Sequence, residues 1–121
     1  MISHIVLFEP KEDLANGDLL LFAQQLSVVL STVPGIKVAR IGRAVQIDSG
    51  QSRKFGDNTY SFSAVLDFED AAALIEYLNH PEHRELGRLF WEYCSSTVVM
   101  EAETVDGLAS EATELLVKKQ N

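Results

Sequence analysis

The chain has 121 residues, of which 46% are apolar and 23% are charged, and this composition predicts one globular domain with a single core. Its formal net charge of −8 and its pI near 4.7 argue against a nucleic-acid-binding surface, which needs clustered Lys and Arg. No apolar run approaches the ~20 residues of a membrane span, and the single cysteine excludes an intramolecular disulfide. We therefore expect a cytoplasmic protein that binds neither nucleic acid nor membrane.

Hydrophobic periodicity predicts strands and helices in the order βαββααβ. Alternation with a period of two indicates strands, and apolar residues three or four apart indicate helices. The N-terminus begins directly with an apolar run and lacks the basic start of a signal peptide, so we expect it to be the first strand. The predicted strands cover residues 2–8, 36–45, 60–68 and 97–102, and the predicted helices cover residues 19–33, 71–78 and 81–93.

This order of elements is typical of an α+β protein with one antiparallel sheet and all helices on one face. We therefore expect a ferredoxin-like βαββααβ sandwich over residues 1–103. The other face of the sheet then lacks cover within the subunit, and a homodimer through this open face is the simplest symmetric arrangement. The apolar side chains expected on the open face are Ile5, Leu7, Ile41 and Val65.

Two segments fall outside the predicted sandwich. Residues 104–121 carry apolar side chains at helical spacing and predict a short amphipathic extension, which packs either on its own body or over a partner. Residues 46–58 are polar and long for a hairpin, so they form either a mobile lid or a passive insertion. Their lack of aromatic residues beyond Phe55 favours the insertion.

The segment EYLNHPEHR contains two of the three histidines and a tyrosine. Pro81 suits the first turn of a helix, so we expect His80 to cap that helix and His83 to lie in its first turn. There the helix dipole opposes a positive imidazole and favours a neutral general base. Tyr77 precedes the break, and the change of direction can turn it toward His83. His4 of the first strand is expected to face the same layer.

These polar groups, set between a sheet and its helices, predict a cavity for a small molecule and no metal or cofactor. A metal site built from His80, His83 and His4 is disfavoured, because the chain has no cysteine pair and no HExxH helix. Isolated Gly87 either allows close packing or leaves room in the cavity. The expected apolar lining consists of Val6, Phe8, Phe22, Ala64, Leu66, Leu86 and Trp91.

Several motifs resemble the stress-responsive dimeric α/β-barrel (Dabb) domain family. They are SHIVLF at the start, TVPGI after the first helix, FED before the second and YLNHPEHRELG with FW in the third. The resemblance implies a ferredoxin-like subunit that dimerises into a barrel. By similarity to polyketide cyclases of the olivetolic acid cyclase type, it implies that His83 acts as a base and that Tyr77 hydrogen-bonds the substrate. His4 matches a cavity residue.

Three functions follow from these observations. The first is a lyase- or cyclase-type acid–base reaction on an apolar or aromatic carbonyl compound, carried out by His83 and Tyr77. The second is a non-catalytic stress-response or ligand-carrying protein in which the histidines are structural. The third is a cofactor-free monooxygenase, since similar dimeric barrels host that chemistry.

Overall fold

A computed structural model describes residues 1–45, 47 and 60–117. The predicted insertion at residues 46–58 lies outside the described residues, apart from Ile47. Strands and helices follow each other in the predicted order. Their bounds are β1 (Ile2–Pro10), α1 (Asn16–Thr32), β2 (Ile36–Arg43), β3 (Phe62–Phe68), α3 (Ala71–Asn79), α4 (Pro81–Tyr93), β4 (Cys94–Glu103) and η1 (Ala112–Leu116).

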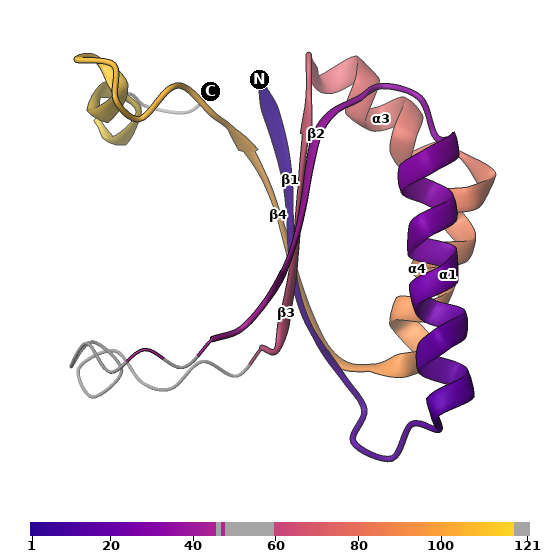
Figure 1. Cartoon of the computed structure of the whole chain (residues 1–121). Coiled ribbons are helices and arrows are strands. Elements are labelled where there is room, and N and C mark those ends of the chain that lie inside the picture. Colours follow the sequence, from indigo (N-terminus) through magenta and orange to yellow (C-terminus); the bar gives the residue numbers. More distant parts are fainter. Residues whose placement is uncertain (46, 48–59, 118–121) are drawn as a thin grey trace.

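The four strands form one antiparallel sheet in the order β2-β3-β1-β4. All three α-helices pack on the same face of this sheet, and the other face is open (Figure 1). The predicted α+β ferredoxin-like sandwich is therefore confirmed. Among the described residues, no helix combines the length and apolar character that crossing a bilayer requires.

Local capping explains where the helices begin and end. The Asp70 carboxylate accepts the Ala73 N–H at the start of α3, and His80 Nδ1 accepts the Glu82 N–H, 3.1 Å away, at the start of α4. The predicted capping role of His80 is thus confirmed. Gly35 follows α1 with φ of 97°, a left-handed conformation that side chains oppose.

The core lies between the centre of the sheet and the helices. Phe68, Leu66, Leu89 and Val29 are its largest fully buried side chains. The ring of Phe8 stacks on Phe22 at 5.8 Å between ring centroids, and Phe90 meets both rings edge-on. This aromatic cluster closes the space between β1, α1 and α4, so the middle of the sandwich is packed solid.

One prediction for the open face is wrong. A bulge between Ile36 and Val38 shifts the register of β2, so that Ile41 pairs with Ala64 of the helix-facing layer. Because directly paired residues share a face, Ile41 points toward the helix side. The open face instead receives Val38 and Arg40 from β2. Its apolar side chains include Ile5, Leu7, Val38, Val65, Val98 and Met100.

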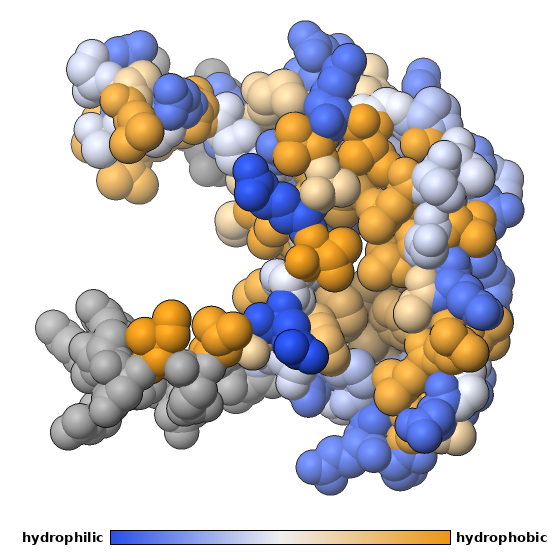
Figure 2. All heavy atoms as spheres, in the orientation of Figure 1, coloured by the Kyte–Doolittle hydropathy of each residue, from blue (hydrophilic) through white to orange (hydrophobic). Residues whose placement is uncertain are grey.

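The segment after β4 leaves the sheet on the side away from the helices (Figure 1). Within its described part it forms only the five-residue 3-10 helix η1 and no longer amphipathic helix. Leu108 is 97% exposed and Leu116 is 86% exposed. Figure 2 shows the part of this segment around η1 standing clear of the sheet, so η1 does not pack on its own body.

Candidate functional site

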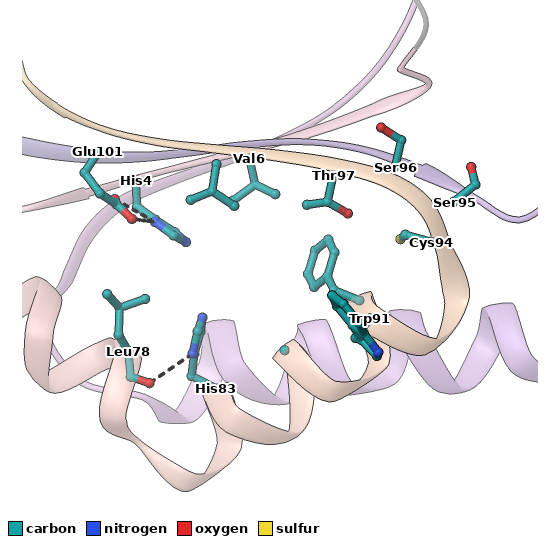
Figure 3. Close-up of a pocket in the computed structure, with 13 residues that line it drawn as sticks. His4, Val6, Leu78, His83, Trp91, Cys94, Ser95, Ser96, Thr97 and Glu101 are labelled. Carbon is teal, nitrogen blue, oxygen red and sulfur yellow. Dashed lines mark hydrogen bonds and ion pairs between the residues drawn. The ribbon is translucent and has the colours of Figure 1, made fainter.

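A cavity of about 650 Å³ lies between β1, the edge strand β4 and helix α4 (Figure 3). Its size falls within the range of small-molecule sites. The cavity forms here because the aromatic cluster fills the centre of the sandwich and leaves the edge strand incompletely covered. Its lining residues are His4, Val6, Leu78, His83, Gly87, Phe90, Trp91, Cys94, Ser95, Ser96, Thr97, Val99 and Glu101.

His4 is placed and oriented by the sheet. Its side chain lies on the helix-facing side of β1 and is only 5% exposed. Glu101 pairs directly with it across β1 and β4, and the carboxylate oxygens lie 2.8 and 2.9 Å from His4 Nδ1. A carboxylate accepts hydrogen bonds, so Nδ1 carries the proton and donates it. The other ring nitrogen, Nε2, faces the cavity (Figure 3).

His83 approaches the same space from the first turn of α4. The carbonyl oxygen of Leu78 lies 3.2 Å from His83 Nδ1. A carbonyl can only accept, so Nδ1 donates and Nε2 of the neutral ring keeps its lone pair. Burial lowers the pKa of His83 below 6.5, the neighbouring His4 lowers it further, and the Leu78 hydrogen bond and Glu101 oppose the shift. His83 is therefore a neutral base near pH 7.

The two imidazoles come from different layers and meet across the cavity. Their ring centroids are 6.2 Å apart, and Figure 3 shows both Nε2 atoms turned into the space between them. A small polar group of a ligand placed there would contact both nitrogens. The arrangement can remove a proton at one side of a carbonyl compound and stabilise charge at the other.

Tyr77 lies behind the histidines and does not line the cavity. It is 2% exposed, and its ring centroid is 4.6 Å from that of His83 and 5.8 Å from that of His4. Burial, and to a smaller extent the charge of Glu101, raises the pKa of Tyr77 to about 12. The phenol therefore stays protonated and supports both rings. Its expected contact with a ligand stays a prediction.

The structure divides the residues expected to bind a ligand into two groups. His4, Val6, His83 and Trp91 line the cavity. The others belong to the buried core, because α1 and α4 close over the centre of the sheet, whereas the cavity lies under β4. These core side chains are Phe8, Phe22, Ala64, Leu66 and Leu86.

Sequence reasoning missed the contribution of β4. Thr97, Val99 and Glu101 alternate along this strand and face the cavity. Their spacing of two is visible in the sequence, but only pairing with β1 shows which alternate set faces the helices. Cys94 also lines the cavity, and burial raises the pKa of its thiol, so it is not an activated nucleophile.

Metal binding receives no support from the described part of the chain. Within it, no group of three or more His, Cys, Asp or Glu side chains is arranged to hold an ion. His80, the third histidine considered for a metal, caps α4 with its Nδ1 and does not line the cavity with His4 and His83.

The lowered pKa of His83 predicts a pH dependence of stability. The unfolded chain binds a proton on this ring near pH 6.5, whereas the folded protein binds it only at lower pH. The contribution of His83 is therefore complete above pH 6.5 and is lost as the pH falls through the folded pKa. Urea unfolding at about pH 8 and about pH 5 should show a smaller acid-induced loss in His83→Gln than in wild type. Equal losses would contradict the lowered pKa.

The family model of the stress-responsive A/B barrel domain (Dabb) matches residues 2–104. The chain belongs to this family. A comparison of this A/B barrel domain with curated protein sequences gives no match. The matched region covers the whole sandwich and every residue that lines the cavity, and it ends where the C-terminal segment leaves β4.

Solved structures share the fold of this A/B barrel domain at low sequence identity. A protein from Arabidopsis thaliana is 18% identical with a TM-score of 0.70, over 88% of this chain and 97% of that one. A dimeric ferredoxin-like protein from Thermobifida fusca is 21% identical with a TM-score of 0.65, over 84% and 88%. The hydroxynitrile lyase from Passiflora edulis is 16% identical with a TM-score of 0.68, over 84% and 90%.

Proposed function

We propose that the protein binds an apolar or aromatic carbonyl compound in the cavity under β4 and catalyses acid–base chemistry at the carbon next to the carbonyl. The observation that supports this most directly is the pair of imidazoles of His4 and His83, whose Nε2 atoms both point into the cavity. The centroids of the two rings are 6.2 Å apart. Each Nδ1 already has a fixed acceptor, so both free nitrogens are available to a ligand.

His83 is the proposed base. Its Nε2 lone pair takes a proton from the carbon beside the carbonyl, and the resulting enolate is ready for an aldol-type closure or for the reverse cleavage. The lowered pKa keeps the ring neutral and able to accept this proton near pH 7. The positive end of the helix dipole also repels a protonated imidazole in the first turn of α4. His83 should therefore release the proton quickly after it has taken it up.

His4 and Glu101 are proposed to stabilise the oxygen of the enolate. When His4 is protonated, its Nε2–H points into the cavity and donates to the carbonyl oxygen, while the Glu101 carboxylate at 2.8 Å balances the charge. The His4 ring is held in place before the reaction, since Glu101 comes from the adjacent strand in direct register. Catalysis would therefore require little rearrangement of the protein.

The shape of the site and the fold support a reaction of this kind. The apolar side chains Val6, Leu78 and Val99 line the cavity, so a molecule that binds there is transferred out of water. A hydroxynitrile lyase has the same fold, which shows that the scaffold accommodates a lyase.

The test is whether the protein accelerates deuterium exchange at the α carbon of 2-butanone, and whether that acceleration needs His83. A non-catalytic ligand carrier would bind the ketone without accelerating exchange.

We further propose that two subunits pair through their open sheet faces. Val98 is 45% exposed and Met100 is 54% exposed there, so apolar surface is left uncovered in the single subunit. Similar structures from Thermobifida fusca, Bacteroides fragilis and a Jannaschia species are described as dimeric ferredoxin-like proteins. Pairing two such faces would bury these side chains in an isologous interface.

Val98→Asp is expected to dissociate this dimer. A two-fold interface carries the substitution twice, and each buried unpaired charge costs about 1–3 kcal/mol or more, so the dissociation constant should rise about a hundredfold. Sedimentation equilibrium measures this change. Ile75→Asp is the matched control, because Ile75 is 56% exposed on α3, in the opposite layer. A monomeric wild type, or a dimer that tolerates the charge at Val98, would refute the interface.

A further inference from the structure

Beyond the sheet, the chain continues into a C-terminal arm, which we define as residues 105–117. The arm leaves β4 on the side of the open face (Figure 1) and lies beyond the region that the family model matches. Its root is fixed to β1, because the Thr104 N–H donates to the Met1 carbonyl oxygen at 3.0 Å and the hydroxyl oxygens of Thr104 and Ser3 lie 3.1 Å apart. The arm therefore starts from a defined position on the sheet.

The arm exposes large apolar side chains. Leu108 is 97% exposed, Leu116 is 86% exposed and Val117 is 81% exposed. Within the described part of the chain, the buried core contains no residue of the arm. A helix as short as η1 has little stability of its own, and clustered exposed apolar side chains mark interaction sites. A surface outside the subunit is therefore needed to cover the arm.

The arm continues the open face of the sheet. Val98, Met100 and Ala102 pair with open-face residues of β1, and the chain passes from this row directly into the arm. Around η1 the arm stands clear of its own sheet on this side (Figure 2). A second copy of the chain that paired through the open face would lie in the space beside the arm.

Charge indicates which part of the second copy the arm meets. The arm contains Asp106, Glu111 and Glu114 and no basic residue. β2 begins with Lys37 and Arg40 at the end of the sheet where β4 ends, whereas β4 has no basic residue. A two-fold axis parallel to the strands places β4 over β2 of the second copy and keeps these ends together. The acidic arm then meets the basic start of β2.

The start of β2 has groups that match the arm. β2 is an edge strand, and Lys37 and Arg40 are exposed on it. Neither side chain forms a salt bridge with any other described residue. Val38 lies between them and is 41% exposed. This surface therefore combines basic groups with an apolar side chain, as the arm combines acidic groups with leucines.

We propose that the C-terminal arm of each subunit docks on the start of β2 of a second copy. The leucines of the arm lose contact with water there, and its carboxylates lie near Lys37 and Arg40 of the second copy. This arm contact rests on the proposed pairing of the open faces, and it fixes the direction in which the two sheets pair. The arms thus hold the dimer from outside the sheets.

Leu108→Asp combined with Leu116→Asp should raise the dissociation constant of the dimer about tenfold or more, because two arms each lose apolar contacts. Both leucines are exposed in the single subunit, so the substitutions should leave its fold intact. Sedimentation equilibrium measures the change. Leu20→Asp is the matched control, since Leu20 is 59% exposed on α1, in the opposite layer. It should leave the dissociation constant unchanged.

A mixing experiment tests whether the arm reaches the second copy. One variant carries Glu111→Lys and Glu114→Lys in the arm, and the other carries Lys37→Glu and Arg40→Glu in β2. Each variant alone places like charges at both arm contacts, whereas a mixed dimer has opposite charges at both. We expect the mixed dimer to be about threefold to tenfold tighter than either parent dimer, measured by native mass spectrometry.

The outcomes separate the arm from the sheet interface. If the double leucine variant dimerises like wild type while Val98→Asp still dissociates the dimer, the arm contact is overturned and the sheet pairing stands. Random pairing of the two charge variants would overturn the docking on β2. A monomeric wild type would overturn the sheet pairing and the arm contact together.

Discussion

His83→Gln is expected to reduce the protein-catalysed exchange of the α protons of 2-butanone in deuterium oxide by about 10²–10⁴-fold, the usual contribution of a positioned general base. Glutamine retains a polar side chain of similar reach but has no basic nitrogen. The measurement is the decay of the α-proton NMR signal with and without protein. It does not require knowledge of the natural substrate.

His80→Asn is the matched control for this substitution. His80 belongs to the same HPEH motif, but its Nδ1 caps α4 by accepting the Glu82 N–H, and the residue does not line the cavity. Asparagine is a favoured cap, so the helix should keep its start and the exchange rate should stay near that of wild type. Exchange that is equally fast in wild type and His83→Gln would rule out His83 as the base.

The pH profile provides a second check on the same residue. Because burial lowers the pKa of His83 below 6.5, the base is neutral through the physiological range. Exchange should therefore fall as the pH drops through this lowered pKa. A rate that keeps rising with pH at the same slope as the reaction in buffer would show that hydroxide, and not His83, removes the proton.

Phe68→Ala is expected to lower the free energy of unfolding by about 3–5 kcal/mol, a large part of the stability of a small domain. Phe68 is fully buried on β3, and its ring centroid lies 5.0 Å from that of Tyr77. Removing the ring leaves a cavity beneath the tyrosine that supports both histidines. Urea denaturation at constant pH measures the loss.

Phe62→Ala is the control for this core substitution. Phe62 lies on the same strand and face but is only partly buried, with its ring 5.6 Å from that of Phe8. Its removal should cost less than the removal of Phe68, because water can fill part of the space. A loss below about 1 kcal/mol for Phe68→Ala would mean that the core closes around the missing ring.

Local rules in the sequence determined the order of the elements and several of their details. The period of two in β1 placed His4, Val6 and Phe8 on the helix-facing side, where all three are buried. Proline at the start of α4 predicted the cap at His80. These predictions succeed because each depends only on the backbone geometry of a few neighbouring residues. The types of those residues are enough to determine that local geometry.

Only the tertiary structure decided the register of the strands and the position of the cavity. The bulge in β2 turned Ile41 to the helix side, and the pairing of β1 with β4 set Glu101 opposite His4. Both depend on hydrogen bonds between distant segments, and a shift of one residue reverses the face of every side chain. The aromatic cluster filled the centre of the sandwich, so the cavity formed under the edge strand, where Gly87 leaves space beside His83.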